Sequence, residues 1–440
     1  MRNRLLINIP FRRFFVKSVH IFCCINRLPV LKRDCERDEK MNAKIIAAAL
    51  AAVMLLSAGS ACGKRPDSEA TSAPESSSAP TAAQTAAEKR LAEMSTEEKV
   101  GQLFIIRPDA LDTSLTPAQI SDASKYGVTE LSDAMAETLK QYPAGGFAFF
   151  GKNITSPEQL EGFAGALNAA RPSLFMAVDE EGGSVSRIAN SKGFDVTKYD
   201  SMESVGDTGD AENARNVGVT IGAYLKKYGF NLDFAPDADV NTNPDNMVIG
   251  DRSFGSDGEL VAKMVSAEID GLHQSGVMSC AKHFPGHGDT KGDTHTQFVY
   301  VDKSWEQLQS CELIPFKAAI GAGTDMIMAA HIAARNVTDD DLPSSMSYEM
   351  ITGKLRGELG YEGIVITDGM AMGAVTQRYS SAEAAVKAIQ AGADIVLMPE
   401  NYIEAFNGVL AAVKDGSISA ARLDESVLRI LELKDKYGLL

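Results

Sequence analysis

The stretch Gly276–Thr290 reads GVMSCAKHFPGHGDT, and it predicts the fold class of the whole chain. Its beginning, Gly276–Ala281, is short and apolar, which is typical of a buried strand. The residues that follow include Pro285 and two glycines, which interrupt a helix, so we expect the side chains from Lys282 onward to lie on a loop. Because α/β enzymes carry their chemistry on loops that follow strands, this stretch indicates an enzyme.

Short apolar runs recur from residue 87 onward and alternate with segments of helical periodicity. Continuously apolar strands that alternate with helices predict a parallel sheet. The predicted strands are Gln102–Ile106, Gly146–Phe150, Leu174–Val178, Leu232–Ala235, Val277–Ala281, Met326–Ala330, Gly363–Thr367 and Ile395–Met398. The predicted helices include Glu212–Lys227, Gly258–Gln274, Lys303–Ile320 and Ala382–Ala391.

About eight strand–helix units over roughly 350 residues predict an α/β fold, namely a single TIM-type (β/α)₈ barrel with insertions. A doubly wound open sheet is the alternative. The chain has no glycine-rich dinucleotide-binding turn after the first predicted strand, which argues against that alternative.

Polar side chains follow several of these predicted strands at the point where each strand ends. They are Asp179, Lys282 with His283, His331 and Asp368. In a barrel, the carboxyl ends of the parallel strands meet at one mouth, where catalytic groups from different strands converge. A single carboxylate at a strand end is often a structural cap, but several polar residues on one rim favour a catalytic site.

The composition limits what this site can bind. With 440 residues, of which 45% are hydrophobic, the chain can bury a large core, and its formal net charge is -16. Nucleic-acid binding requires clustered lysine and arginine, so this charge argues against a nucleic-acid partner. A strongly acidic body favours neutral or cationic ligands instead.

The N-terminal part of the chain predicts an export signal. Residues 1–40 show no domain-like pattern, and we interpret them as an over-long gene start that precedes the true initiator Met41. Residues 41–62 combine a lysine, an apolar run shorter than a membrane span and small residues before Cys62, which is typical of a secretory signal. Cys62 resembles the lipidation site of a bacterial lipoprotein, with cleavage and free secretion as the alternative. We therefore expect the protein at the outer face of the cytoplasmic membrane, held by its lipid anchor only.

Residues 63–86 predict a disordered tether between this signal segment and the catalytic barrel, which we place at residues 87–440. The tether is dominated by Ser, Ala, Thr and Pro, and a stretch with so few large apolar side chains cannot bury enough surface to fold. The barrel contains two cysteines, Cys280 and Cys311, whose apolar surroundings predict buried thiols. A disulfide between them stays open as an alternative.

Several motifs taken together resemble glycoside hydrolase family 3, and specifically its β-N-acetylglucosaminidase branch. The similarity runs from Met94–Leu103 to Leu423–Leu431, which is essentially the whole barrel. Lys282–Gly288 with Asp293 and His295 is a specific signature of this branch. The other matching segments are Asp179–Gly183 (DEEGG) with Val185 and Arg187, Gly250–Gly255 (GDRSFG) and Ile366–Met370 (ITDGM).

Residue by residue, the resemblance implies a retaining enzyme that removes terminal N-acetylglucosamine. It implies Asp368 as the nucleophile, His295 as the general acid/base and Asp293 as the partner of His295. It implies that the residues gripping the cleaved sugar are Asp179, Arg187, Arg252, Lys282 and His283. It gives no role to His287 or His331, and it implies neither a cofactor nor a metal. The implied substrates are peptidoglycan fragments or chitooligosaccharides, and we expect a monomer.

The residue types suit this chemistry on their own terms. Retaining cleavage needs a carboxylate on one face of the sugar and a proton donor on the other. Asp368 can form the covalent glycosyl–enzyme intermediate. Histidine, whose ordinary pKa is about 6.5, can protonate the leaving oxygen and later deprotonate water. Asp293 lies two residues before His295 and can hold one nitrogen of its ring, which fixes the tautomer.

Other readings of these residues stay open. Imidazoles and carboxylates are ordinary metal ligands, so His283, His287, His295, Asp289 and Asp293 could form a metal site, although their spacing has no helical register. A non-catalytic sugar-binding lipoprotein is a second alternative, but every catalytic position of the resemblance is occupied. A β-glucosidase of the same family is a third; such relatives commonly take their acid from a further C-terminal domain, whereas His295 supplies one within the barrel. Phosphate could also replace water as the acceptor, because a histidine repels phosphate less than a carboxylate does.

Overall fold

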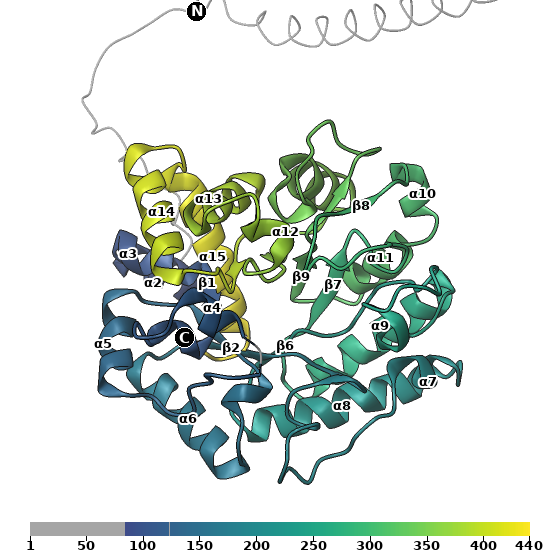
Figure 1. Ribbon diagram of the computed structural model, residues 1–440, viewed down its shortest axis with the longest axis horizontal. Helices are drawn as coiled ribbons and strands as arrows, with labels where there is room; N and C mark the ends of the chain where they lie inside the picture. The colour runs from purple at the N-terminus through teal and green to yellow at the C-terminus, as the bar shows by residue number, and fades with distance from the viewer. Residues whose placement is uncertain (1–83, 123) are drawn as a thin grey trace, which may run out of the picture. The chain divides into compact units, whose positions relative to one another are not determined.

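Parallel strands form a closed ring in the part of the chain that this computed structural model describes, residues 84–440 except Ala123 (Figure 1). The predictions for residues 1–40, for residues 41–62 with Cys62, and for the tether up to residue 83 lie outside the described residues. The ring strands are β1 (Phe104–Ile106), β2 (Gly146–Phe149), β3 (Phe175–Val178), β6 (Leu232–Asp233), β7 (Cys280–Phe284), β9 (Met326–Ala329), β11 (Ile364–Thr367) and β12 (Val396–Leu397).

The ring consists of two parallel sheets joined by isolated bridges. One sheet has the order β12-β1-β2-β3-β6 and the other has the order β11-β9-β7. The bridge between Leu232 and Met278 joins β6 to the residues before β7, and the bridge between Ile366 and Ile395 joins β11 to the residue before β12. All of these pairings are parallel, so the predicted α/β barrel is confirmed.

Helices surround the ring, and most connect one ring strand to the next (Figure 1). They are α2 (Ala86–Glu93), α3 (Thr96–Gln102), α4 (Pro117–Ser121), α5 (Asp133–Gln141), α6 (Pro157–Ala170), α7 (Met202–Gly206), α8 (Ala211–Lys227), α9 (Gly258–Gln274), α10 (Trp305–Gln309), α11 (Leu313–Gly321), the π-helix η6 (Glu349–Glu358), α12 (Gly373–Thr376), α13 (Ser381–Ala391), α14 (Tyr402–Asp415) and α15 (Ala420–Lys436).

The helix α9 illustrates why these segments fold as they do. The side chain of Asp257 accepts a hydrogen bond from the Leu260 amide and caps the helix, which satisfies one of its free N–H groups. Its apolar face packs on α8 so closely that a β-carbon at Gly218 would lie 2.3 Å from the carbonyl oxygen of Glu268. Gly271 meets α8 in the same way, at 2.2 Å from the carbonyl oxygen of Arg215, so this contact requires glycine.

The structure also corrects some predicted boundaries. Gly258–Gln274 is confirmed as α9, whereas the helix predicted over Lys303–Ile320 is two helices, α10 and α11. Pro315 lies in the first turn of α11, where its missing N–H removes no intrahelical bond, so it favours a new helix start. Neither Cys280, which is buried, nor Cys311, which is partly exposed, forms a disulfide.

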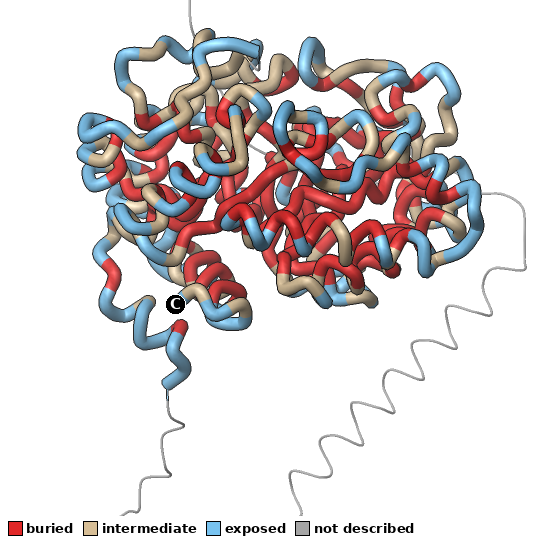
Figure 2. The backbone as a smooth tube through the Cα atoms, turned by 90° about the horizontal axis from the view of Figure 1, so that it is seen from below, coloured by how far each residue is buried: buried red, intermediate tan, exposed pale blue. Residues whose placement is uncertain are grey.

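The core follows the ring. Figure 2 shows buried residues concentrated in the interior of the described part, with exposed residues toward the periphery. Every residue of β1, β2, β3, β7, β9 and β11 is buried. The sequences of β1, β2, β3 and β9 are apolar throughout, as is usual for buried parallel strands, whereas β7 also buries Lys282 and His283. Within the described residues, the helices are all too short or too polar to span a membrane.

Small strands that are not among the predicted ones lie outside the ring and shape the mouth of the barrel. An antiparallel pair, β4 (Glu180–Gly182) and β5 (Val185–Ser186), follows β3 directly. A parallel pair, β8 (Val299–Val301) and β10 (Ile332–Ala334), joins the segments that follow β7 and β9. These insertions place polar side chains beside the ends of the ring strands.

Candidate active site

A pocket of about 400 Å³ opens at the carboxyl ends of the ring strands. It is lined by every predicted site residue of the barrel except Asp293, namely Asp179, Arg187, Arg252, Lys282, His283, His295 and Asp368. The structure therefore brings together side chains from segments up to 189 residues apart in the sequence, from Asp179 to Asp368. This convergence is expected of a barrel whose loops share one mouth.

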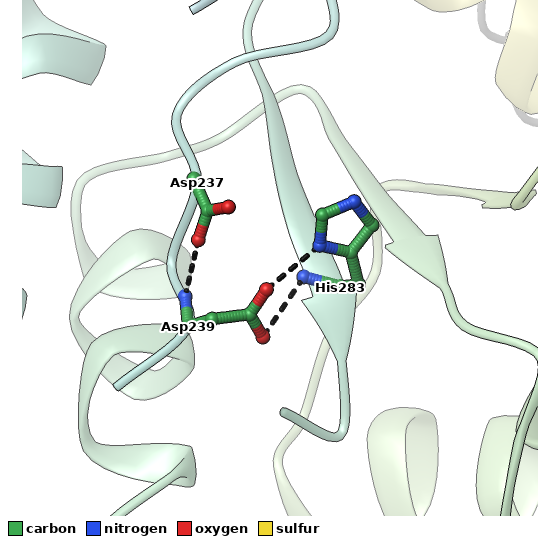
Figure 3. Close-up of side chains that lie close together, drawn as sticks. All are labelled: Asp237, Asp239 and His283. Atoms are coloured by element: carbon green, nitrogen blue, oxygen red, sulfur yellow. Dashed lines mark hydrogen bonds and ion pairs between the residues drawn. The ribbon is translucent and has the colours of Figure 1, made fainter. Parts of the chain in front are cut away.

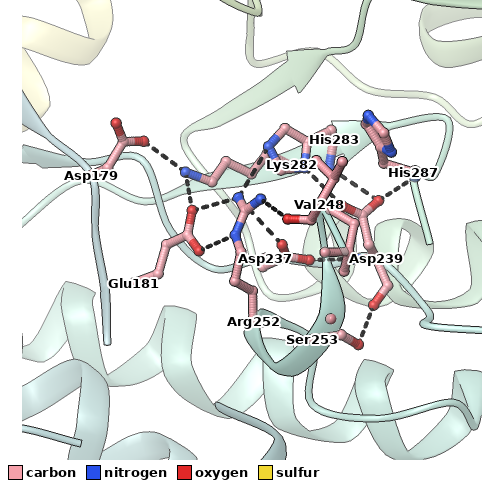
Figure 4. Close-up of polar contacts among 12 residues, drawn as sticks. Asp179, Glu181, Asp237, Asp239, Val248, Arg252, Ser253, Lys282, His283 and His287 are labelled. Atoms are coloured by element: carbon pink, nitrogen blue, oxygen red, sulfur yellow. Dashed lines mark hydrogen bonds and ion pairs between the residues drawn. The ribbon is translucent and has the colours of Figure 1, made fainter. Parts of the chain in front are cut away.

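Lys282 is the centre of a buried ion-pair network on one side of the pocket. Its Nζ lies 2.8 Å from Asp179 Oδ1 and 2.5 Å from Glu181 Oε1 (Figure 4). Burial alone would lower the pKa of Lys282, but the two carboxylates raise it above its usual range. The same contacts hold the pKa of Asp179 well below its usual range against the effect of burial. Lys282, Asp179 and Glu181 are therefore all ionised, and their opposite charges balance one another, as buried charges require.

Arg252 joins this network through a two-pronged contact. Its Nε and Nη2 donate to the two oxygens of Glu181, each at 2.8 Å (Figure 4). Burial would raise the pKa of Glu181, but Arg252 and Lys282 lower it to about 2. Glu181 belongs to the DEEGG motif but has no role expected from the sequence, yet this residue fixes the positions of Arg252 and Lys282. Bidentate pairs of this kind orient both partners strongly.

The predicted loop placement is wrong for Lys282 and His283, which lie within β7. The strand continues to Phe284 because the neighbouring segments supply backbone partners. The Lys282 amide donates to the carbonyl oxygen of Pro236, and the Ala238 amide donates to the carbonyl oxygen of Lys282. Both side chains thus stand on a rigid element, which favours precise positioning of a bound ligand.

His283 is held by a carboxylate beneath it. Its Nδ1 lies 2.7 Å from Asp239 Oδ2, and Asp237 Oδ1 accepts a hydrogen bond from the Asp239 amide (Figure 3). Burial and the positive charge of Arg252 lower the pKa of His283 to about 4. Burial and the charge of Asp239 raise the pKa of Asp237 to about 7. Neither aspartate has a role expected from the sequence.

The metal alternative can be tested against this geometry. In the described part of the chain, the side chains close enough to share an ion are Asp237, Asp239 and His283, which is not the set proposed from the sequence. Arg252 Nη2 lies 3.6 Å from Asp237 Oδ2 and already places a positive charge there. Asp289, a member of the proposed set, pairs instead with Lys303 at 3.2 Å. The residues therefore fit an ion pair with Arg252 better than they fit a metal ion.

Asp368 lies at the end of β11 and reaches the pocket. Its amide donates to the carbonyl oxygen of Ala329, and its Oδ1 accepts a hydrogen bond of 2.7 Å from the Gly369 amide. Burial would raise the pKa of Asp368, but nearby His331 and His283 together with that amide lower it. The carboxylate is therefore ionised and available as a nucleophile at neutral pH.

Asp293 and His295 form a second aspartate–histidine pair, on the loop after β7. His295 Nδ1 lies 2.8 Å from Asp293 Oδ1, and the same oxygen accepts a hydrogen bond from the His295 amide. Because Nδ1 contacts a carboxylate, it carries the proton in the neutral ring, and Nε2 remains for exchange with a ligand. The side chain of His295 is 65% exposed and lines the pocket.

The loop that carries this pair is attached to the segment that follows Asp368. The Gly373 amide donates to the carbonyl oxygen of His295 at 3.0 Å, and the Ala374 amide donates to that of Thr294 at 3.1 Å. The side-chain amide of Gln377 donates to the carbonyl oxygen of Thr296 at 2.9 Å. The segment that follows Asp368 and the loop that carries Asp293 and His295 are thus attached to each other through α12.

The two histidines without an expected role both support this arrangement. His331 Nε2 donates to the carbonyl oxygen of Gly369 at 3.0 Å, so its ring holds the residue next to Asp368. His287 Nδ1 lies 2.7 Å from the Thr290 hydroxyl, within the loop that leads to Asp293. Burial lowers the pKa of both rings, which keeps them neutral and suited to fixed hydrogen bonds.

Together, the fold and the pocket define a class of protein. It is a parallel α/β barrel whose mouth is lined by an ionised carboxylate and by the histidine of an aspartate–histidine pair, with a polar floor suited to a ligand rich in hydroxyl groups. Comparison with known sequences identifies the family. The sequence profile described as "Glycosyl hydrolase family 3 N terminal domain" matches residues 95–433, and the chain belongs to this family.

The relatives include "Beta-hexosaminidase A" of Pseudoalteromonas piscicida, 33% identical over 341 residues, which are 71% of this chain and 56% of that protein. A "Beta-hexosaminidase" of Tolumonas auensis is 35% identical over 62% of this chain and 80% of its own length. Among solved structures, a family 3 β-N-acetylglucosaminidase from Paenibacillus sp. str. FPU-7 has a TM-score of 0.71 and 36% identity, over 79% of this chain and 63% of that one. The chain thus spans less than two thirds of the first and the last of these relatives.

Proposed function

We propose that the protein is a retaining exo-β-N-acetylglucosaminidase that removes terminal N-acetylglucosamine from peptidoglycan-derived fragments or chitooligosaccharides. The observation that carries the proposal is that one pocket is lined both by Asp368 and by His295, whose ring is held by Asp293. The names of the relatives, which are β-hexosaminidases and a β-N-acetylglucosaminidase, support the choice of sugar.

The proposed mechanism has two steps. In the first, an oxygen of Asp368 attacks the anomeric carbon while His295 Nε2–H protonates the leaving oxygen, which gives a covalent glycosyl–enzyme. In the second, the neutral His295 takes a proton from water as the water attacks the same carbon, and Asp368 leaves. Asp293 holds Nδ1 throughout and stabilises the imidazolium when it forms.

The floor of the pocket supplies the binding part of this proposal. Lys282, Arg252 and Arg187 present donors, and Asp179 presents an acceptor, to the hydroxyl groups and acetamide of the sugar at the cleaved end. Because these groups are already ion-paired in the free protein, they lose little freedom when the sugar binds.

The experiment that tests the class of enzyme uses the full chain and its Asp368→Ala variant. We expect the full chain to release 4-nitrophenol from the β-N-acetylglucosaminide far faster than from the β-glucoside, and Asp368→Ala to abolish turnover while it unfolds at a similar temperature. Preference for the glucoside would keep the family and overturn the substrate. Absence of turnover of both substrates would favour the non-catalytic sugar-binding alternative.

The site of action is part of the same proposal. We infer export and lipid anchoring at Cys62 from the signal-like residues 41–62. Expression in a bacterium supplied with a labelled fatty acid should label the wild type and not Cys62→Ala. Equal labelling of both proteins would contradict the anchor, and absence of label in both would indicate free secretion.

A further inference from the structure

Four side chains form an aromatic stack beside the loop that carries His295. In order along the stack they are Arg378, Phe298, Tyr300 and Arg335. The guanidinium carbon of Arg378 lies 3.7 Å from the centre of the Phe298 ring, and that of Arg335 lies 3.1 Å from the centre of the Tyr300 ring. The two ring centres lie 4.9 Å apart, and their planes differ by 53°. Each ring is thus in contact with the other ring and with one cation.

Strand pairing brings these side chains together from three segments of the chain. Phe298 and Tyr300 are two residues apart on the extended segment that enters β8, so they lie on the same face of it. β8 pairs in parallel with β10, and Arg335 follows the last residue of β10 directly. Arg378 lies in the turn after α12. The aromatic stack therefore joins the segments that follow the ring strands β7, β9 and β11.

Phe298 is also close in the chain to His295, which lies three residues before it. The amides of Gly373 and Ala374, which are the first two residues of α12, donate to carbonyl oxygens of the loop that carries His295, at 3.0 and 3.1 Å. The first amides of a helix have no acceptor within the helix, so the loop supplies the acceptors here. At the other end of α12, Arg378 contacts Phe298. The loop is thus attached to α12 at two points, one by backbone and one by side chains.

The guanidinium of Arg378 has no salt bridge within the described residues, whereas that of Arg335 lies 3.2 Å from Asp341. Arg378 is exposed, and neither it nor Phe298 lines the pocket. A cation above a ring at an exposed site is held with modest strength. Loss of this contact should therefore change the attachment of the loop and leave the core of the barrel intact.

We propose that Arg378 and Phe298 are positioning residues, which hold His295 in the place from which it exchanges protons by fixing the end of its loop against α12. This inference rests on the proposed function, because it gives the aromatic stack a part in the proton transfers of His295. A general acid must lie within hydrogen-bond reach of the leaving oxygen, so a displaced His295 would protonate that oxygen less often. A leaving group that needs no proton would be affected little.

The test measures kcat of the full chain on N,N′-diacetylchitobiose and on 4-nitrophenyl β-N-acetylglucosaminide. We expect Arg378→Gln to lower kcat on the disaccharide about two- to fivefold, the factor that corresponds to one exposed cation–π contact, and to leave kcat on the aryl glycoside close to that of the wild type. Arg378→Lys should recover most of the loss, because an ammonium above the ring is also attracted to it.

Substitution of the ring tests the same contact from its other side. Phe298→Leu removes the partner of Arg378 and of Tyr300 together, so we expect a loss on the disaccharide of roughly tenfold. Adding Arg378→Gln to Phe298→Leu should lower kcat no further, since the contact is already absent. If the two losses multiplied instead, Arg378 would act independently of Phe298, and the proposal would be wrong.

The matched control is Lys227→Gln at the end of α8. Lys227 Nζ lies 4.9 Å from the centre of the Tyr228 ring, so this substitution also removes one positive charge and one cation–π contact. Lys227 does not line the pocket, and we expect both rates to stay unchanged. A loss on the disaccharide equal to that of Arg378→Gln would show that a change of surface charge suffices, which would overturn the positioning role.

A second readout needs no substrate. Hydrogen exchange of the Gly373 and Ala374 amides reports on the attachment of the loop, because these amides donate to its carbonyl oxygens. We expect faster exchange of both amides in Arg378→Gln than in the wild type or in Lys227→Gln, measured by NMR or by mass spectrometry. Unchanged exchange would overturn the positioning role.

The two readouts distinguish this inference from the proposed function. Turnover by the wild type together with equal losses on both substrates for Arg378→Gln overturns the positioning role and leaves the proposed function intact. Faster exchange in a protein that hydrolyses neither substrate supports the hold on the loop and overturns the proposed function. Turnover, faster exchange and a loss confined to the disaccharide support both.

Discussion

The pocket contains two aspartate–histidine pairs with almost the same geometry and different surroundings. His283 Nδ1 lies 2.7 Å from Asp239 Oδ2, and His295 Nδ1 lies 2.8 Å from Asp293 Oδ1. The side chain of His283 is 10% exposed, whereas that of His295 is 65% exposed. Contact between an imidazole and a carboxylate therefore does not by itself identify an acid/base catalyst; the surroundings of the pair decide what it can do.

The buried pair is suited to binding. Burial and Arg252 lower the pKa of His283 to about 4, so the ring is neutral at neutral pH. Arg252 Nη2 lies 3.4 Å from His283 Nε2, which leaves neither ring nitrogen free of a protein contact. A ring held at both nitrogens keeps one tautomer and can offer a fixed contact to a sugar, but it is poorly placed to exchange protons.

The exposed pair is suited to proton transfer. Its Nδ1 is held by Asp293, and within the described residues His295 Nε2 makes no hydrogen bond. The pair lies on a loop whose backbone is attached to α12, the helix that follows Asp368. Substitutions that affect one pair and spare the other therefore test whether the two pairs have different functions.

The largest effect is expected from His295→Ala. Loss of a general acid/base costs on the order of 10²- to 10⁴-fold in rate, and the loss is greatest when the leaving group needs a proton. We expect such a loss in kcat for a natural disaccharide and a much smaller loss for the 4-nitrophenyl glycoside, whose leaving group is a weak base. Steady-state rates on the two substrates measure the difference.

The counterpart is His283→Ala, which should lower kcat/KM for both substrates by a similar factor because it removes a contact to the sugar that both share. Equal losses on both substrates for His295→Ala would contradict its assignment as acid/base. A loss for His283→Ala that depends on the leaving group would mean that the buried pair also transfers protons. The proposed division between a binding pair and a proton-transferring pair would then be wrong.

A smaller effect is expected from Gly373→Ala, which alters only the attachment of the exposed pair. An added β-carbon would lie 2.8 Å from the carbonyl oxygen of His295, so the loop must move and its hydrogen bond to the Gly373 amide must lengthen. Because small displacements of a catalytic group are costly, we expect kcat on the disaccharide to fall by roughly tenfold. The 4-nitrophenyl glycoside should be affected less.

The control for this substitution is Gly162→Ala in α6, where an added β-carbon meets no atom within 4 Å. It should leave both rates unchanged, since Gly162 lies outside the pocket. If Gly373→Ala left kcat on the disaccharide unchanged, the contact with α12 would not be what positions His295.

The fold and part of the pocket could be predicted from the sequence because they depend on local patterns. Apolar runs followed by polar residues located the ring strands and placed Asp179 and Asp368 at their ends. The end of β7 could not be predicted because its last residues pair with partners that are remote in sequence, such as Phe284 with Ala329. Glycine and proline after Lys282 suggested a loop, and the neighbouring strands overrode that suggestion.

The support of the pocket could not be predicted either, because it consists of contacts between distant charges. Glu181 and Arg252 lie 71 residues apart, and Asp239 and His283 lie 44 residues apart. Glu181 belongs to the DEEGG motif, which indicates no role for it, and nothing in the local sequence distinguishes Asp239 from the other acidic residues of a chain with 59 Asp and Glu.

The smallest effect concerns stability, and it distinguishes the buried pair without any substrate. The pKa of His283 is lowered from 6.5 to about 4 on folding, so the unfolded chain binds this proton more readily than the folded one between those values. The contribution of this residue to stability is therefore complete above pH 6.5 and is lost as the pH falls toward 4. The variant His283→Asn removes the titrating group, and its side-chain amide can still donate a hydrogen bond to Asp239.

We expect the melting temperature of the wild type to fall relative to that of His283→Asn as the pH is lowered from 7 to 4. A constant gap between the two curves, or one that widens in favour of the wild type, would show that the ring of His283 is not kept neutral by its surroundings, and the two pairs would then not differ in the way the geometry indicates.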